Sequence, residues 1–439
     1  MVYMPVKTMN FQIEGGTRLS GKISTNASKN SAVALLQAAL LNKNKTVLRN
    51  VPKIEEVSRI IEVLRSIGTS VRWVNRRDVE IIPGETNLEN IDREAAMLTR
   101  SVILLLGPMV HLKPRFKIPQ PGGCKLGSRT VRPHLFALEE FGIKIKTTSD
   151  SYEVSADRLM PAEIVLYESG DTATENAIMA AAKIEGTTII KFASANYQIQ
   201  DLCFFLQGLG VEIDGIGTTT LKITGRKEID APTEFFISED PIESMLFISI
   251  AAATNSSITI ERCPIDFLEL ELLKLKKMGF RYRILKRYKA KNGQTNLVDI
   301  KTYTSKLKAL EEKIEARPFP GLNIDNLPFF VPIATQAKGE TLIHDWVYEN
   351  RAIYYTELTK LGAEINLADP HRVFIKGVTP LRAAEVIAPP ALRPAAIIMI
   401  AMLAARGIST LRNVYSINRG YEDICARLNQ LGAKIKIIK

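Results

Sequence analysis

The sequence of 439 residues is longer than a single hydrophobic core usually serves, so more than one domain is expected and two lobes are the simplest arrangement. Its 46% hydrophobic and 24% charged residues are typical of a globular protein and exclude extensive disorder. Scattered cysteines without a CxxC spacing exclude a disulfide framework and a zinc site. We expect neither a metal nor another cofactor.

The first residues, 1–7, lack a basic start followed by an apolar run, which predicts no secretory signal and a cytoplasmic protein. The most apolar run, from Ala395 to Ala405, is too short to cross a bilayer and predicts a buried helix. We therefore expect no membrane partner. The sequence carries no signal for an oligomeric state.

The formal net charge of +11 suits nucleic acid, an acidic membrane surface or a small anionic substrate, and charge alone does not choose among them. Much of the basic excess lies between Lys274 and Arg317. Scattered lysines without interleaved aromatic residues are more typical of a solvated surface hairpin than of a nucleic-acid interface. We therefore expect no nucleic-acid partner.

In chain order, the first predicted element is a strand at residues 11–13. Helices that are apolar on nearly every side follow at residues 32–41, 101–110, 177–182, 245–253, 329–334 and 394–405. A helix without a polar face must be buried on all sides. Alternating segments at 186–190, 256–260 and 407–411 predict strands between these helices.

One short pattern recurs six times: leucine, two residues, an apolar residue, glycine, two residues, and a β-branched or aromatic residue. Its glycines are Gly68, Gly142, Gly210, Gly279, Gly362 and Gly432. Their spacings of 74, 68, 69, 83 and 70 residues indicate an internal repeat. Each copy predicts the last turn of an amphipathic helix, a left-handed glycine that ends it, and a strand.

Each repeat is therefore expected to contain strand, buried helix, strand, amphipathic helix and strand. Three repeats per lobe would enclose three buried helices within sheets and amphipathic helices, with the ligand site in the cleft between the lobes. The predicted first lobe spans residues 30–230. The second spans 1–29 and 231–439, because the strand at 11–13 is expected to pair with it.

The Gly-rich loop 120–129 contains Cys124 beside a lysine and before a helix start, and these neighbours favour a thiolate. Cys124 is therefore a candidate nucleophile or acid, with a structural cysteine in a surface turn as the alternative. Cys203, Cys263 and Cys425 lie in apolar stretches and are expected to pack in the core.

Other candidates lie at predicted helix starts. Lys29 and Asn30 precede the first buried helix, where N–H groups also favour a phosphate or carboxylate; a surface cap is the alternative. Asp325 is a candidate general base or a helix cap. Arginines at helix starts or in connecting loops are Arg100, Arg351, Arg393 and Arg419. They form an anion clamp if these ends share one side of each lobe; otherwise they are surface arginines.

These residues, together with a repeat that covers nearly the whole chain, resemble the enolpyruvyl transferases, whose α/β fold is a two-lobed inside-out barrel. The Gly-Gly-Cys loop resembles the branch that acts on UDP-N-acetylglucosamine. In that branch the enolpyruvyl group of phosphoenolpyruvate passes to the 3-hydroxyl of the sugar with release of phosphate, the first committed step of peptidoglycan synthesis. The resemblance implies a transferase that uses these two small-molecule substrates.

The resemblance also implies a role for each candidate. Cys124 would donate a proton and form an adduct with phosphoenolpyruvate, and Asp325 would take the proton from the acceptor hydroxyl. Residues implied to bind phosphoenolpyruvate are Lys29, Asn30, Arg129, Arg393 and Arg419. Residues implied to contact the sugar nucleotide are Arg100, Val131, Asp325, Val347 and Arg351. Addition of an alcohol to an enol phosphate, followed by elimination, needs an acid, a base and cations over the phosphate.

The sequence departs from the family pattern at several positions. Ala391 stands where the family has an aspartate two positions before the arginine equivalent to Arg393, which removes a candidate acid or base. Arg132 replaces a carboxylate of the uridine pocket. Glu168 and Asp171 stand where diphosphate-binding residues are expected, and like charges there should repel a diphosphate.

These departures leave alternatives open. The altered pocket favours a transferase with another acceptor, such as a different nucleotide or a shikimate-like alcohol. Ala391 favours a catalytically silent paralogue that binds a ligand or a partner protein. RNA 3′-phosphate cyclases share a related repeat architecture, and with the basic charge this leaves RNA-end processing as a further alternative.

Overall fold

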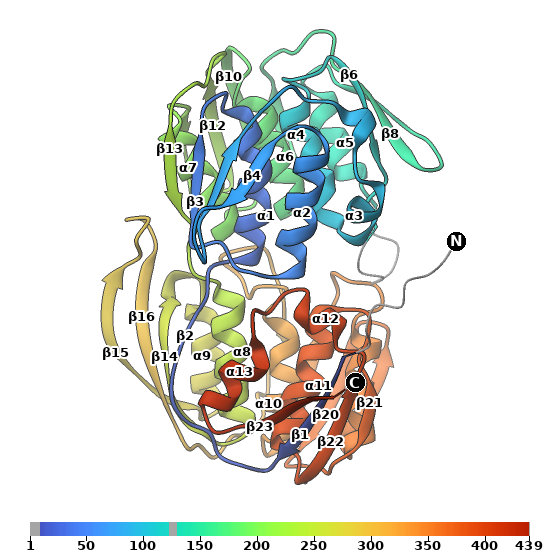
Figure 1. Cartoon of the computed structure of the whole chain (residues 1–439). Helices are drawn as coiled ribbons and strands as arrows, with labels where there is room; N and C mark the ends of the chain where they lie inside the picture. Colours follow the sequence, from blue (N-terminus) through green and yellow to red (C-terminus); the bar gives the residue numbers. More distant parts are fainter. Residues whose placement is uncertain (1–8, 123–129, 439) are drawn as a thin grey trace. The chain divides into compact units, whose positions relative to one another are not determined.

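The computed structural model describes residues 9–122 and 130–438 (Figure 1). By their contacts these residues fall into two compact units, and each unit is described by itself. The middle unit contains residues 27–122 and 130–238, and the terminal unit contains residues 9–26 and 239–438. Cys124 and Arg129 lie outside the described residues.

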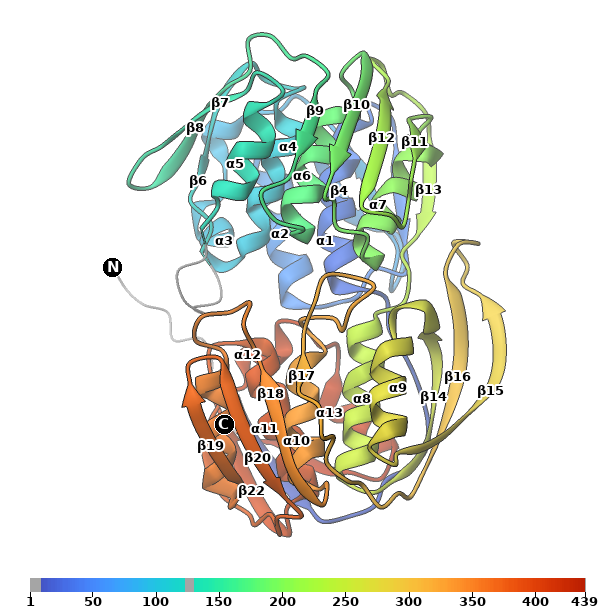
Figure 2. The same cartoon turned by 180° about the vertical axis from the view of Figure 1, so that it is seen from behind.

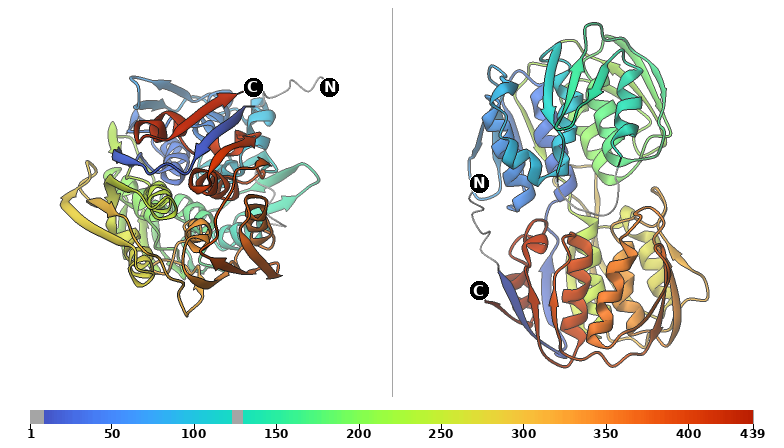
Figure 3. Two further views of the ribbon diagram at one scale, coloured as in Figure 1. Left: turned by 90° about the horizontal axis from the view of Figure 1, so that it is seen from below. Right: turned by 90° about the vertical axis from the view of Figure 1, so that its right-hand side faces the viewer.

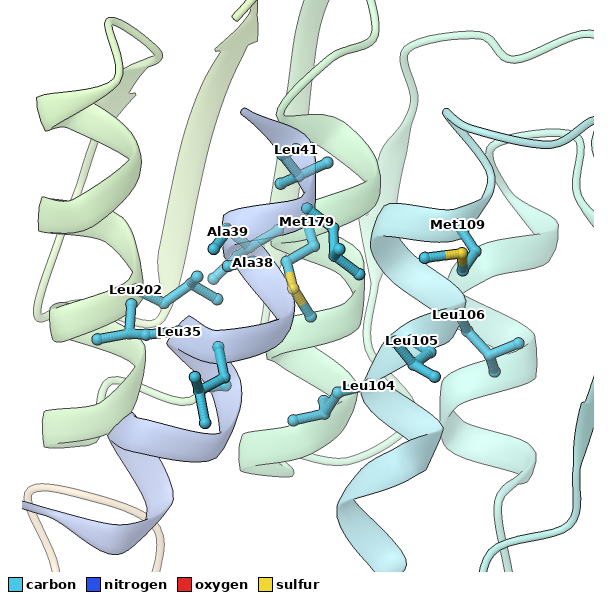
Figure 4. Close-up of a cluster of buried hydrophobic side chains, with 14 of the residues drawn as sticks. Leu35, Ala38, Ala39, Leu41, Leu104, Leu105, Leu106, Met109, Met179 and Leu202 are labelled. Carbon is cyan, nitrogen blue, oxygen red and sulfur yellow. The ribbon is translucent and has the colours of Figure 1, made fainter. Parts of the chain in front are cut away.

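Apolar helices form the centre of the middle unit (Figure 1). They are α1 (Lys29–Ala38), which continues into η1 (Ala39–Leu41), then η3 (Arg100–Leu105), which continues into α4 (Leu106–Met109), and α6 (Asp171–Ala181). Every residue from 31 to 41 is buried, as expected of a helix without a polar face. Figure 4 shows this core, in which Leu35 of α1 lies near Leu202 of the neighbouring helix α7 (Tyr197–Gly208).

The terminal unit has the same kind of centre. Its apolar helices are α8 (Pro241–Ala253), α10 (Phe330–Thr335), which follows η5 (Leu327–Phe329), and α11 (Leu392–Ala404). Every residue of α8 is buried. The buried helices predicted from the sequence are thus confirmed in both units.

Sheets cover the central helices of the middle unit (Figure 2). The first has the order β13-β3-β5-β4, with strands Thr233–Phe236, Thr46–Arg49, Val79–Ile82 and Ser70–Trp73. The second has the order β11-β12-β10-β9, with strands Glu212–Asp214, Thr220–Gly225, Gly186–Lys191 and Glu163–Val165. The third has the order β6-β8-β7, with strands Arg115–Pro119, Ser151–Ser155 and Lys144–Thr147.

The sheets of the terminal unit follow the same plan. One has the order β15-β16-β14-β2, with strands Arg281–Lys289, Asn296–Tyr303, Ser257–Pro264 and Ser20–Ser24. Another has the order β17-β18-β20-β19, with strands Ile314–Glu315, Gly339–His344, Arg372–Gly377 and Glu364–Asp369. The last has the order β21-β22-β1-β23, with strands Glu385–Ile387, Gly407–Arg412, Asn10–Gly15 and Lys434–Ile438. Figure 3 shows β1 in blue among the red strands of this sheet.

An outer helix precedes each repeat glycine. These helices are α2 (Glu55–Ser66), α5 (Arg132–Glu139), α7, α9 (Glu269–Lys277), η6 (Ala352–Leu361) and α13 (Ile424–Gln430). In α2 the buried residues Val57, Ile60, Ile61 and Leu64 follow the spacing of one helix face. All the repeat glycines have φ between +86° and +99°, so the predicted left-handed stop is confirmed.

Some helices depart from the predicted α form. Residues 100–105 and 352–361 adopt the tighter 3-10 geometry. In the first case Gly107 and Pro108 follow directly, and proline lacks the N–H that a continuous α-helix needs. The remaining short helices are η2 (Leu88–Asn90), α3 (Arg93–Leu98), η4 (Ile265–Phe267) and α12 (Tyr415–Asn418).

The basic segment between Lys274 and Arg317 contains the hairpin β15-β16, which confirms the predicted surface hairpin (Figure 2). Residues of β15 are exposed or half-buried along their whole length. Cys203, Cys263 and Cys425 are buried, as predicted, and burial raises the pKa of each thiol to about 12. Within the described part of the chain, no helix combines the length and apolar character that crossing a bilayer requires.

The repeat glycines differ in what surrounds them, and this difference can be tested. A Cβ at Gly68 would overlap the backbone carbonyl of Glu85, whereas a Cβ at Gly210 would meet the end of the flexible Arg226 side chain. Both variants, Gly68→Ala and Gly210→Ala, pay roughly 1–2 kcal/mol for a left-handed alanine. We expect Gly68→Ala to lower the midpoint of urea unfolding further than Gly210→Ala. Equal midpoints would contradict a steric role for the Gly68 turn.

Candidate functional site

In the middle unit, the start of α1 holds Lys29 and Asn30. The Ser28 side chain caps the helix by accepting the Ser31 N–H at 3.0 Å. The Asn30 amide donates to the Tyr197 hydroxyl at 2.9 Å and to Gln198 Oε1 at 3.2 Å, both on α7. The neighbouring helix α7 therefore fixes the orientation of the Asn30 amide. These hydrogen bonds are more than the surface cap that the sequence allowed as an alternative.

Glu175 on α6 completes this group. Gln198 Nε2 donates to Glu175 Oε1 at 3.2 Å, and the Glu175 side chain is almost fully buried. Burial, with a smaller contribution from Asp171, raises the pKa of Glu175 well above its usual range, and the nearby Lys29 opposes this rise. Lys29 thus lies close to a carboxyl that its positive charge helps to ionise.

Arg100 and Val131 belong to a second group in the middle unit. Arg100, at the start of η3, donates to the Thr130 carbonyl at 3.4 Å. Val131 caps α5 and packs half-buried against the core. These two predicted sugar-nucleotide contacts therefore lie on adjoining segments of one unit.

His134, in the first turn of α5, lies near enough to Arg100 for the arginine charge to act on it. Asn176 Oδ1 accepts the Gly107 N–H at 2.9 Å, which orients the Asn176 amide so that its nitrogen donates to His134 Nδ1 at 2.9 Å. His134 Nε2 then carries the proton and donates to Thr172 Oγ1 at 3.2 Å. Burial, with a smaller effect of the Arg100 charge, lowers the pKa of His134 to about 3. The imidazole is a neutral support for α5.

In the terminal unit, Asp325 meets Arg393 near the start of α11. Arg393 Nη2 donates to Asp325 Oδ2 at 3.3 Å, and Nη1 donates to the Tyr421 hydroxyl at 2.6 Å. The Arg393 side chain is buried, while that of Asp325 is 24% exposed. Asp325 thus keeps access to solvent while an arginine, itself held by Tyr421, fixes its position.

Arg351 approaches Asp325 from another direction. Its Nη1 lies 3.8 Å from Asp325 Oδ1, while Nε and Nη2 donate to both oxygens of Asp345 at 2.6 and 2.8 Å. The Tyr355 hydroxyl also donates to Asp345. Arg351 is 1% exposed, so its charge is buried and satisfied within the unit. This placement suits a residue that positions Asp325; the predicted contact with the sugar nucleotide stays a prediction.

Arg419 and Val347 are the remaining predicted site residues of the terminal unit. Arg419 directly follows α12 and is half-buried. Val347 follows β18 in a loop and is 41% exposed. Both are accessible to a ligand. Cys124 and Arg129, the predicted acid and a predicted phosphate-binding residue, lie outside the described residues.

The positions at which the sequence departs from the family pattern differ in their surroundings. Ala391 is fully buried and caps α11, which therefore begins without a side-chain cap. Asp171 accepts hydrogen bonds from Ser194 and from Asn196, the latter at 3.2 Å, so its carboxylate is engaged within the unit. Arg132 is exposed.

The sequence did not reveal the partners that hold the candidates. Tyr197, Asp345, Tyr355 and Tyr421 were missed because a tyrosine or aspartate carries no sign of its distant partner. Among residues 9–122 and 130–438, no cluster of three His, Cys, Asp or Glu side chains could hold a metal ion.

Helices that present cations and a supported carboxylate on a repeated α/β scaffold are the parts that an enolpyruvyl transferase requires. The family model described as EPSP synthase (3-phosphoshikimate 1-carboxyvinyltransferase) matches residues 13–428, so the chain belongs to this family of transferases, as predicted.

Individual relatives and a solved structure are similar to this chain over nearly its whole length. UDP-N-acetylglucosamine 1-carboxyvinyltransferase of Bradyrhizobium diazoefficiens is 35% identical over 432 residues, covering 98% of each chain. The Treponema denticola protein of the same name is 34% identical over 429 residues, covering 97% of this chain and 98% of the relative. The crystal structure of the enolpyruvyl transferase NikO from Streptomyces tendae superposes with a TM-score of 0.85 at 24% identity, covering 98% and 99% of the chains. The predicted fold is thereby confirmed.

The buried histidines predict how stability responds to acid. Burial lowers the pKa of His134 to about 3 and the pKa of His111 to about 4, so both stay neutral in the folded protein. An unfolded histidine, in contrast, takes up a proton below about pH 6.5. The unfolded state then binds more protons, so the free energy of unfolding should fall as pH drops from 6.5 towards 4.

The variant His134→Gln tests this expectation, because it removes one of the two buried imidazoles. We expect the loss of stability between pH 7 and pH 5, followed by urea unfolding, to be smaller in the variant than in the unmodified protein. The slopes are compared, because the substitution also changes stability at pH 7. Identical slopes would show that His134 takes up its proton equally in both states.

Proposed function

We propose that this protein transfers the enolpyruvyl group of phosphoenolpyruvate to the 3-hydroxyl of UDP-N-acetylglucosamine with release of phosphate. The names of full-length relatives at 35% and 34% identity support this choice of acceptor. The structural observation that carries it is the Asp325 carboxylate, 3.3 Å from Arg393 and 3.8 Å from Arg351. We further propose that the two units are the predicted lobes and that the protein works in the cytoplasm.

The proposed reaction has two stages. In the first, the acceptor oxygen bonds to C2 of phosphoenolpyruvate, its proton passes to Asp325, and Cys124 gives a proton to the methylene carbon. In the second, the C2–O bond to phosphate breaks, the Cys124 thiolate takes a proton back from the methyl group so that the double bond is restored, and Asp325 passes its proton to the departing phosphate. One carboxylate and one thiol thus move the protons, and every atom of the substrates is accounted for.

The cations and the amide of Asn30 have separate tasks in this scheme. Lys29, Asn30, Arg129, Arg393 and Arg419 would bind phosphoenolpyruvate. Its phosphate gains charge as it leaves, and positive groups that are already oriented stabilise this change without rearrangement. Support for Asn30 and Arg393 comes from their neighbours, because Tyr197 and Tyr421 fix the amide and the guanidinium before a ligand arrives.

Contacts to the sugar nucleotide would come from Arg100, Val131 and Val347, with Arg351 positioning Asp325. Arg100 and Val131 are favoured because the Thr130 carbonyl joins their segments. Val347 is favoured by its exposure in a loop.

Replacement of the proposed base tests this scheme. We expect Asp325→Asn to lower the rate of acceptor-dependent phosphate release from phosphoenolpyruvate by roughly 10²- to 10⁴-fold, because an amide cannot accept the proton. Asp369→Asn is the matched control, since Asp369 is a carboxylate of the same unit bonded to an arginine, Arg372. Release without an acceptor, or full activity of Asp325→Asn, would refute the proposal. Cys124→Ser should lose turnover in the same assay.

Ala391 offers a second test of the same site. Ala391→Asp supplies a helix cap and a carboxylate, and Ala391→Asn supplies a comparable cap without the charge. We expect both variants to raise the urea midpoint of unfolding, and only Ala391→Asp to raise the rate of phosphate release. A fall in that rate with Ala391→Asp would indicate that the site has adapted to the alanine.

A second candidate function is the same transfer to another acceptor. The exposed cation Arg132 favours it, because the family carries a carboxylate there for the uridine. Phosphate release measured with a panel of nucleotide sugars and shikimate-like alcohols separates the two candidates. A preferred acceptor other than UDP-N-acetylglucosamine would replace the leading proposal.

A further inference from the structure

Helix α9 of the terminal unit, labelled in Figure 2, buries a carboxyl group that the proposed reaction does not use. Glu271 lies in the first turn of this helix and is 2% exposed. A glutamate is almost never buried so completely unless other groups satisfy it. Burial raises the pKa of Glu271, and hydrogen bonds from Asn326 and Asn323 oppose this rise. These two partners therefore indicate what the buried carboxyl group is for.

Both partners belong to the turn 323–326. Glu271 Oε1 accepts the Asn323 backbone N–H at 3.1 Å and a hydrogen bond from Asn326 Nδ2 at 2.8 Å. The partners lie 52 and 55 residues beyond Glu271 in the sequence, so only the folded chain brings helix and turn together. Asp325, the proposed base, stands between them, because Asn323 lies two residues before it and Asn326 directly after it.

Asn323 transmits this contact to the backbone of Asp325. Its side-chain Oδ1 accepts the Asp325 N–H at 2.8 Å, and its backbone carbonyl accepts the Asn326 N–H at 2.9 Å. An asparagine that bonds to the backbone two residues further on forms an Asx turn, which fixes the local conformation. A continuous series of hydrogen bonds thus runs from Glu271 through Asn323 to the Asp325 backbone.

Asn326 depends on Glu271 as well. Asn326 is fully buried, and among the described residues its Oδ1 has no hydrogen-bond partner. Its bond to Glu271 therefore satisfies the amide through the nitrogen. Without Glu271 the amide of Asn326 would lose this bond inside the core, which costs more than the loss of an exposed hydrogen bond. We therefore expect the turn to shift when Glu271 is replaced by an apolar residue.

The arginines beside Asp325 act on a different part of it. Arg393 Nη2 is 3.3 Å from one carboxylate oxygen and Arg351 Nη1 is 3.8 Å from the other, while Arg351 also donates to the Ile324 carbonyl at 2.8 Å. Charge-assisted bonds of this type are usually about 2.7–2.9 Å long. The longer distances indicate that the turn limits how closely the carboxylate approaches the two cations.

We propose that Glu271 is a positioning residue for the reaction, because it fixes the turn 323–326 and thereby the place of the Asp325 carboxylate. This inference depends on the proposed function, in which Asp325 takes the proton from the acceptor hydroxyl. A displacement of a reacting group by about 1 Å can cost roughly 10²-fold in rate. Loss of Glu271 should therefore slow the chemical step and leave the binding of phosphoenolpyruvate nearly unchanged.

Two variants separate the hydrogen bonds of Glu271 from the space that it fills. Glu271→Gln keeps an oxygen acceptor, whereas Glu271→Met has a similar length and no such acceptor. We expect kcat for acceptor-dependent phosphate release to fall roughly tenfold or more in Glu271→Met and to stay within about twofold in Glu271→Gln, with KM for phosphoenolpyruvate little changed in both. An unchanged kcat in Glu271→Met, or equal losses in the two variants, would overturn the proposal.

Glu80→Met is the matched control. Glu80 is a buried glutamate of the middle unit, and its Oε1 accepts a hydrogen bond from Arg72 at 2.6 Å. We expect this variant to lower the urea midpoint of unfolding and to keep kcat. A loss of kcat in Glu80→Met as large as that in Glu271→Met would overturn the proposal, because any buried glutamate would then have the same effect.

A combined variant shows whether Glu271 acts through Asp325. We expect Glu271→Met to cause no more than about a twofold further loss of kcat in the Asp325→Asn protein, since no base is left to displace. The same loss in both backgrounds would overturn the proposal. Full activity of Asp325→Asn would refute the proposed function itself. A normal rate in Glu271→Met beside an impaired Asp325→Asn would refute only the role of Glu271.

Hydrogen exchange and a second position keep the test independent of folding defects. Glu271→Met should speed exchange of the Asn323 amide, which loses its acceptor, and Glu271→Gln should not. Asn323→Ala removes the acceptor of the Asp325 N–H at a half-buried position, without a change in the core. We expect it to lower kcat with little change in KM for phosphoenolpyruvate. Normal kcat in Asn323→Ala, or unchanged exchange in Glu271→Met, would contradict the proposal.

Discussion

The complete burial of apolar helices is the constraint on which this structure depends. A helix such as α8, buried at every residue, can be stable in water only when other elements cover all its sides. The repeated outer helices and sheets provide that cover. The candidate cations Lys29, Arg100 and Arg393 all stand at helix starts, where the apolar pattern begins, whereas Glu175 in the middle of α6 is buried and hydrogen-bonded to Gln198.

The candidate site follows a second rule, that a buried charge must be paired. Arg351 lies at 1% exposure and is bonded through two nitrogens to Asp345, which itself is fully buried. Such a pair has little freedom to move. Asp325 is more exposed and lies against this rigid neighbour, so the proposed base is oriented by groups that are already fixed within the unit.

Much of the fold could be predicted because helix, glycine and strand are local signals that recur. Gly68 and its counterparts ended helices where expected, since a positive φ favours glycine strongly. The supports of the site could not be predicted in this way. Tyr421 and Arg393 are 28 residues apart, and Asp325 and Arg393 are 68 apart, so only the folded chain brings them together. The repeat also implied equal sheets, and the turn at 88–90 broke that regularity.

Strand β1 pairs antiparallel with both β22 and β23, although nearly the whole chain separates them in sequence. During synthesis on the ribosome β1 precedes the middle unit, and both of its neighbours follow it. The middle unit, continuous from residue 27 to 238 apart from the short loop, is synthesised completely in between. β1 therefore stays without these two partners while the middle unit is synthesised, and its sheet is complete only after β23 has been made.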